Sequence, residues 1–195
     1  MSKKQKYLII HCTASRPETK VDKGYFERLH KGPCDNADGT VTYLGKKYKN
    51  RSLLPNETQG GVSIKTLKGR GWRRFGYRGA VIQDGSWLEL SPNNGDSIIE
   101  DWEITNGATG INDVAEHIVY AGGVDANDPK KAKDTRTQPQ KAKLAALCFE
   151  EIKQNPSVLI GGHYHFAQKA CPSFNVEVWL QSIGIPEKNI YRKGK

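Results

Sequence analysis

The sequence predicts a mixed α/β fold, because short apolar runs typical of buried strands alternate with segments of helical periodicity. The strand candidates are YLIIHC at 7–12, HIVYAGG at 117–123 and SVLIGGH at 157–163. The chain has 195 residues, of which 36% are hydrophobic, so it can build a core. This length fits one ordinary domain, or one domain that carries a large insertion.

The pattern changes twice after the first strand candidate. In VDKGYFERLH, residues Val21, Tyr25 and Leu29 lie four apart and form one face of a predicted helix. Residues 32–70 are instead rich in Gly, Asn and Lys, with ADG and YLGKKY as turn signals. We therefore predict a single domain, residues 1–195, with a loop-rich insertion at about 32–70 that holds one hairpin.

Regular structure returns in the second half of the chain. In AVIQDGSWLEL, residues 80–90, the Asp-Gly pair between two apolar runs predicts a β-hairpin. Thr137 and Gln140 form a capping box at the start of a predicted helix, which Pro156 ends. The apolar face of this helix consists of Leu144, Leu147, Cys148 and Ile152.

A final helix is predicted in NVEVWLQSIGIP, residues 175–186. Asn175 caps its start, and Gly184 and Pro186 end it. Its apolar face consists of Val176, Trp179, Leu180 and Ile183. Helices of this kind are expected to pack on the predicted strands.

The net charge of +9 indicates an anionic partner, such as nucleic acid, acidic lipid or an acidic cell-wall polymer. The alternative is that surface lysines only keep the protein soluble. No segment approaches the roughly 20 apolar residues of a membrane span, so no membrane anchor is expected. The apolar run in MSKKQKYLIIHC is too short for a signal-peptide core. In a reducing cytosol, the four cysteines are expected to be metal ligands or core residues.

The stretch GHYHFAQKACPSF, residues 162–174, gathers two histidines and a cysteine, the side chains that zinc prefers. Two strand candidates, YLIIHC and SVLIGGH, carry a His at or next to their carboxyl end, and sites in α/β sheets gather at the carboxyl ends of strands. Three candidate ligands follow, namely His11, one of His163 or His165, and Cys171. Composition leaves the choice of histidine open, and a single His or Cys is more often structural than a ligand.

Five segments carry a family resemblance: YLIIHCTAS, GWRRFGY, HIVYAGGVDAN, DTRTQPQKAKL and GHYHFAQKACPSFNVEVW. Their residues and their order resemble the zinc-dependent N-acetylmuramoyl-L-alanine amidases of the phage lysozyme type, which are related to peptidoglycan recognition proteins. The resemblance covers nearly the whole chain except about residues 32–70. It implies a central mixed β-sheet flanked by helices.

The same resemblance implies roles for individual residues. The family places its ligand eight residues before the cysteine, which selects His163 and makes His165 a bystander that lines the cleft or is exposed. The implied ligands of one Zn²⁺ per chain are thus His11, His163 and Cys171. The Gly-Tyr pair of GWRRFGY and the lysine two residues before the cysteine imply two catalytic residues, Tyr77 and Lys169.

The implied reaction is hydrolysis of the amide between N-acetylmuramic acid and L-alanine of the peptidoglycan stem peptide. Zinc can lower the pKa of a bound water to about 7 and polarise the carbonyl. Lys169 lies two residues from Cys171, so in extended chain both side chains point to the same side. Its ammonium could then stabilise the oxyanion, while Tyr77 orients the water.

The sequence departs from the family pattern at two places. Arg78 and Gly79 follow Tyr77, where relatives often have His and bulky apolar residues. The strand position where some relatives carry a catalytic Glu is apolar here, near Val119, so no carboxylate base is expected. Weak candidates for substrate contact are Asn106, Arg78 and His165.

Three other functions are alternatives to a zinc-dependent amidase. A non-catalytic peptidoglycan-binding module would usually lack the cysteine ligand, which is present here as Cys171. A basic nucleic-acid-binding protein is suggested by KGRGWRRFGYR, but no zinc-finger, helix-turn-helix or RNA-binding signature accompanies it. A structural zinc domain would usually offer four protein ligands rather than three.

We therefore expect a monomeric enzyme whose partner is bacterial peptidoglycan, with no nucleic-acid partner. It would be made in the cytoplasm without a signal peptide and would act on the cell wall after the membrane is breached, as a phage endolysin in host lysis. A cytosolic wall-recycling amidase is the alternative.

Overall fold

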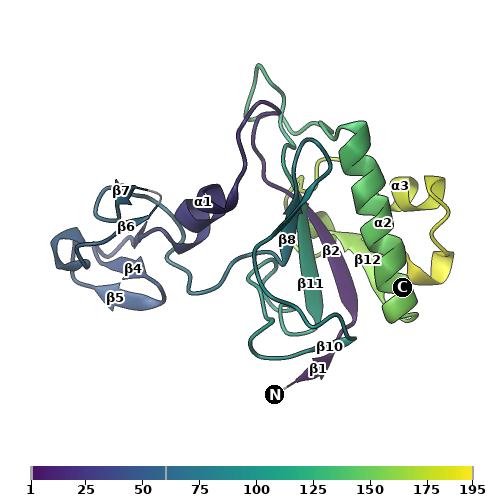
Figure 1. Ribbon diagram of the computed structural model, residues 1–195, viewed down its shortest axis with the longest axis horizontal. Helices are drawn as coiled ribbons and strands as arrows, with labels where there is room; N and C mark the ends of the chain where they lie inside the picture. Colours follow the sequence, from purple (N-terminus) through teal and green to yellow (C-terminus); the bar gives the residue numbers. More distant parts are fainter. Residues whose placement is uncertain (1, 60, 195) are drawn as a thin grey trace. The chain divides into compact units, whose positions relative to one another are not determined.

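The computed structural model describes residues 2–59 and 61–194 (Figure 1). The chain divides into two compact units. The first combines Met1–Thr19 with Tyr77–Lys195, and the second is Lys20–Gly76. The segment 32–70, which the sequence distinguishes by its composition, lies within the second unit.

The first unit is built on a five-stranded mixed sheet, which confirms the predicted α/β class. Four neighbouring strands are parallel, and the last is antiparallel to its neighbour and closes the predicted hairpin. In spatial order the strands are β12 (Leu159–Gly162), β2 (Tyr7–Cys12), β11 (Ala115–Tyr120), β8 (Gly79–Val81) and β9 (Trp87–Glu89).

Two helices, α2 (Gln138–Gln154) and α3 (Val176–Ser182), pack beside this sheet (Figure 1). Side chains alternate between the faces of a strand. In β2, Leu8, Ile10 and Cys12 join the core under the helices, and Ile9 and His11 therefore point to the opposite face. The helix side of this core also contains Leu144, Cys148, Val176 and Leu180.

Both predicted helix starts are confirmed. At α2, the Gln140 N–H donates to Thr137 Oγ1 at 3.2 Å, and the Thr137 N–H donates to Gln140 Oε1 at 3.0 Å. At α3, the Val178 N–H donates to the Asn175 side chain at 3.0 Å. These bonds satisfy amides that lack a partner within a helix, so local sequence alone locates the two helices.

The predicted helical face in the second unit is wrong. A short helix, α1 (Lys23–Phe26), continues into a π-helical turn, η1 (Glu27–Lys31). Phe26 and His30 are buried, whereas Tyr25 and Leu29, which were predicted for that face, are only half-buried. Val21 is buried but precedes the Asp22 cap, so it lies outside the helix, and a helical face counted from Val21 does not match the face that the helix buries.

The second unit contains more strands than the single predicted hairpin. A three-stranded sheet and a separate two-stranded pair surround a small core of Val41, Tyr43, Leu54 and Ile64. Each strand has only two or three residues, too few to show an alternating pattern in the sequence. The elements are β3 (Cys34–Asp35), β4 (Val41–Tyr43), β5 (Lys46–Tyr48), η2 (Arg51–Leu53), β6 (Thr58–Gln59) and β7 (Val62–Ser63).

Short elements complete the first unit. Strand β1 (Lys3–Lys4) pairs with β10 (Ile98–Ile99), and two 3₁₀ turns, η3 (His163–His165) and η4 (Glu187–Asn189), follow β12 and α3. Within the described ranges, none of the helices has the length and apolar character that crossing a bilayer requires.

Candidate metal centre

Strand register brings two histidines together at the carboxyl end of the sheet. Gly162 of β12 pairs with Ile10 of β2, so His163 follows directly beside His11. Both side chains are buried, and their ring centroids lie 4.5 Å apart. The parallel pairing of β2 and β12 therefore creates a two-histidine cluster from residues that are distant in sequence.

Cys171 joins this cluster from the loop that follows η3. Its carbonyl accepts a hydrogen bond from the Tyr164 N–H at 2.9 Å, which holds the loop against the turn. Its Sγ lies 3.8 Å from His11 Nδ1 and accepts from the Cys12 N–H at 3.3 Å. One ligand atom from each of His11, His163 and Cys171 lies within 4.8 Å of the others.

The donor set fits a zinc ion. Two imidazoles and one thiolate are ligands that zinc favours, and three protein ligands leave a position for water, as in catalytic sites. In the absence of a cation, the contact with the Cys12 thiol and then burial raise the pKa of the Cys171 thiol. A bound cation opposes both effects, because coordination deprotonates a thiol.

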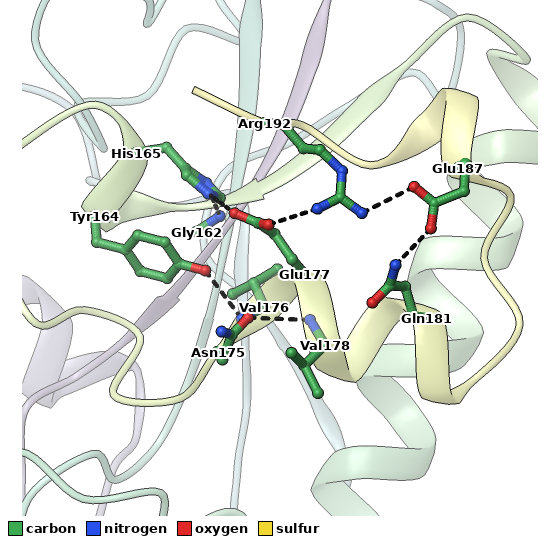
Figure 2. A network of polar contacts seen from close by, with 10 residues as sticks. All are labelled: Gly162, Tyr164, His165, Asn175, Val176, Glu177, Val178, Gln181, Glu187 and Arg192. Atoms are coloured by element: carbon green, nitrogen blue, oxygen red, sulfur yellow. Dashed lines mark hydrogen bonds and ion pairs between the residues drawn. The ribbon is translucent and has the colours of Figure 1, made fainter. Parts of the chain in front are cut away.

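His165 is not available as a metal ligand, because its two ring nitrogens contact Gly162 and Glu177 (Figure 2). Its Nδ1 accepts from the Gly162 N–H at 3.1 Å, and its Nε2 lies 2.9 Å from Glu177 Oε1. Arg192 bonds the other oxygen of Glu177 at 2.9 Å and holds it in place. Because both ring nitrogens are engaged, these contacts favour His163 over His165 as the second histidine donor.

Of the two residues implied as catalytic, Tyr77 lies beside His11, and Lys169 lies on the loop that carries Cys171. The Tyr77 ring centroid is 5.0 Å from that of His11, and the side chain is half-buried. Lys169 is exposed on the Cys171 loop, and its charge acts to lower the pKa of the Cys171 thiol. Lys169 and Cys171 also line a groove of about 270 Å³, together with Cys12, Ala14, Gly123, Val124, Pro129, Lys130, Ala132, Ala170 and Ser173.

The weak candidates for substrate contact are placed elsewhere. The Arg78 guanidinium donates to Glu116 Oε2 at 2.6 Å, and Asn93 Nδ2 donates to Glu116 Oε1 at 2.5 Å. Arg78 thus belongs to a partly buried polar cluster rather than to the groove. Asn106 is half-buried and precedes Gly107, the residue that lies against the ring of His117.

One residue close to the cluster is not among the predicted site residues. His117 of β11 is fully buried, and its Nδ1 lies 3.1 Å from His11 Nε2. Burial, followed by the charge of His163, lowers the pKa of His117 to about 3. The sequence does show a histidine in a strand candidate that is mostly apolar. It does not show that this histidine contacts His11, which is 106 residues away in sequence.

Comparison with known proteins gives both sequence relatives and structural neighbours. No protein-family model matches the chain. The chain is 28% identical over 114 residues to the endolysin of Klebsiella phage KP32, a match that covers 58% of this chain and 69% of the endolysin.

Two solved structures show the fold. The N-acetylmuramoyl-L-alanine amidase LysC from Clostridium intestinale superposes with a TM-score of 0.59 at 16% identity, covering 94% of this chain and 87% of LysC. The bumblebee peptidoglycan recognition protein PGRP-SA has a TM-score of 0.55 at 12% identity, covering 91% of this chain and 80% of its own.

Proposed function

We propose that this chain, a homologue of phage endolysins with the amidase and peptidoglycan recognition protein fold, is an N-acetylmuramoyl-L-alanine amidase. It hydrolyses the amide bond between N-acetylmuramic acid and L-alanine in bacterial peptidoglycan, and it does so in host lysis. The observation that carries the proposal is the cluster of His11, His163 and Cys171 beside a groove that Lys169 lines.

The cofactor we infer is one Zn²⁺ per chain, held by His11, His163 and Cys171. His11 offers Nδ1, because its Nε2 already faces His117. The chemistry that such an ion supplies is Lewis-acid activation of water and of the scissile carbonyl. The Cys12 N–H, 3.3 Å from Cys171 Sγ, helps to stabilise the thiolate form that metal binding needs.

Tyr77 and Lys169 act on the reacting groups from the protein side. The Tyr77 phenol, close to His11, holds the attacking water in position through its oxygen. The Lys169 ammonium stabilises the negative charge that develops on the carbonyl oxygen as water adds. Because Lys169 is exposed on the rim of the groove, it can reach a bound substrate.

The groove itself suits a stem peptide. Val124, Pro129 and Ala132 contribute apolar walls, and Lys130 and Lys169 add two positive charges. Apolar walls can pack against alanine methyl groups, and lysines can pair with the carboxylates that stem peptides carry. We infer that the peptide side of the substrate lies here and that the enzyme meets the wall once the membrane is breached.

The experiment is release of free stem peptides from purified peptidoglycan, measured with zinc-loaded protein, after chelation and after zinc is restored. We expect release to stop with the chelator and to return with zinc. Lys169→Met should slow release by roughly 10²–10³-fold, the usual effect of removing one oxyanion donor. Lys153→Met, which removes an exposed lysine at the end of α2, is the control and should cleave like wild type.

A non-catalytic wall-binding module, the rival suggested by the likeness to PGRP-SA, gives a different result. It would sediment with peptidoglycan but release no stem peptide under any metal condition. That outcome would refute the proposed activity.

A further inference from the structure

His117 is a buried titratable residue that the proposed reaction does not use directly. It lies in β11, the central strand of the sheet, where it pairs with Ile9 of the neighbouring strand β2. Its Nδ1 is 3.1 Å from Nε2 of His11, and its side chain has no exposure to solvent. This contact joins His117 to the candidate metal centre through one hydrogen bond.

The second ring nitrogen of His117, Nε2, indicates that the contact with His11 is the main role of this side chain. Nε2 is buried and has no hydrogen-bond partner among residues 2–59 and 61–194. A buried polar atom without a partner destabilises a fold, so an apolar side chain would be more stable at this position. A histidine at this position is therefore explained by the contact of its Nδ1 with His11 and not by its contribution to stability.

We propose that His117 is a positioning residue that accepts a hydrogen bond from the His11 Nε2–H and so prepares His11 Nδ1 to bind zinc. The proposal rests on the zinc site described above. Ligating histidines usually donate their other N–H to a protein acceptor, which fixes both tautomer and ring orientation. Here the acceptor is a second imidazole rather than a carboxylate or a carbonyl.

The positions of the protons follow from the geometry. A neutral imidazole carries one proton, and His11 Nδ1 must be unprotonated to bind a metal beside Cys171 Sγ. The His11 proton is then on Nε2, and His117 Nδ1 must accept it. His117 Nδ1 can accept only when it carries no proton, which leaves the His117 proton on the buried Nε2.

Packing holds the His117 ring in the orientation that this hydrogen bond requires. A Cβ atom on Gly107 would lie 2.2 Å from His117 Cγ, so the glycine backbone lies directly against the ring. The His117 carbonyl accepts from the Arg78 N–H at 2.8 Å, which anchors the main chain of the strand. The acceptor is therefore part of a rigid element, as precise positioning of a ligand requires.

The first test compares His117→Leu with His117→Asn. Leucine fills the space but cannot accept a hydrogen bond, whereas the Asn oxygen lies close to where Nδ1 was. We expect His117→Leu to weaken zinc binding by about 10–100-fold and His117→Asn to restore most of the affinity. Zinc dissociation constants are measured by competition with a chromophoric chelator, on protein shown to be folded by circular dichroism.

Ile118→Val is the matched control, because this neighbour on β11 points into the core on the other face. It should bind zinc like wild type although it also perturbs the strand. Equal zinc affinity in His117→Leu and wild type would overturn the inference, as would equal weakening in the Leu and Asn variants. Absence of zinc binding by wild-type protein would instead refute the proposed zinc site.

A second measurement needs no variant and decides the matter if His117→Leu does not fold. Long-range ¹H–¹⁵N correlation of the zinc-loaded wild-type protein reports which ring nitrogen of each histidine carries a proton. We expect protons on Nε2 of His11 and on Nε2 of His117. A proton on His117 Nδ1 would overturn the inference.

Discussion

At the scale of single residues, the two histidines after β12 differ in what their ring nitrogens contact. His165 donates to Glu177 through one nitrogen and accepts from the Gly162 N–H through the other. His163 instead faces His11 and shares a cluster with Cys171. Position in the turn thus places one histidine in the candidate metal centre and the other in a hydrogen-bond network.

This difference predicts that alanine substitution affects zinc binding at one histidine and stability at the other. His163→Ala should lose bound zinc, because it removes one of the three proposed ligands. His165→Ala should keep one zinc per folded chain but lose roughly 1–3 kcal/mol of unfolding free energy, since the buried Gly162 N–H loses its acceptor. Metal analysis and urea unfolding measure the two effects.

Cys171→Ala serves as a second ligand variant and should behave like His163→Ala. Retention of stoichiometric zinc in both ligand variants would contradict the assignment of the site. Loss of zinc in His165→Ala alone would show that the choice between the two histidines is wrong.

At the scale of elements, α2 carries a carboxyl group on its inward face. Glu151 is buried, and burial, followed by the negative charge of Glu116, raises its pKa to about 7. Arg78, which pairs with Glu116, opposes this shift only in part. The helix therefore favours the protonated form of a group that is ionised in the unfolded chain at neutral pH.

Glu151 should make stability depend on pH in a defined direction. Its pKa is higher in the folded state, so its stabilising contribution is complete below about pH 4.5 and is lost as the pH rises through 7. Glu151→Gln should remove this dependence and be more stable than wild type at pH 8, by roughly 2–3 kcal/mol. The measurement is urea unfolding at pH 4 and pH 8.

Glu150→Gln is the control for this experiment, because Glu150 is the exposed neighbour on the same helix. It should leave the pH dependence of stability unchanged. The same stability difference between Glu151→Gln and wild type at both pH values would contradict the argument.

At the scale of the whole molecule, positive charge is concentrated in one unit. Lys20–Gly76 contains 13 Lys and Arg against 5 Asp and Glu, a net charge of +8, whereas the rest of the chain carries +1. Among the residues that the structure describes in this unit, Lys47 pairs with Asp38 and Arg51 pairs with Asp35. The exposed basic residues of this unit include Lys46, Lys49, Lys68, Arg73 and Arg74.

This distribution predicts that the unit contributes most of the salt-dependent binding to the anionic wall. The triple variant Lys46→Gln, Lys49→Gln, Lys68→Gln should bind purified peptidoglycan more weakly than wild type at about 50 mM salt, with a smaller difference at about 150 mM. Cosedimentation measures the bound fraction. The control neutralises three exposed lysines of the other unit, Lys4, Lys153 and Lys188, and should bind nearly as wild type does.

Equal binding by the two triple variants would contradict this prediction. It would mean that net charge alone, and not its location in Lys20–Gly76, governs attachment to the wall.

Features that depend on neighbouring residues could be predicted from the sequence. The buried strand 7–12 shows as a continuous apolar run, and the capping box of Thr137 and Gln140 marks a helix start within four residues. The buried face of α1 was predicted wrongly, because the face was counted from Val21, which lies before the Asp22 cap and outside the helix. The strands of the second unit are too short to produce any period.

Residue patterns were enough to predict the fold class, the chemical groups at the ends of the strands and the family that they resemble. Which of these groups meet became clear only from how the strands pair and pack. His11 lies beside His163 because β2 and β12 pair in parallel, and it contacts His117, which is 106 residues away. Local patterns determine backbone conformation, whereas strand pairing and packing between distant segments determine the partners of a buried nitrogen or carboxylate.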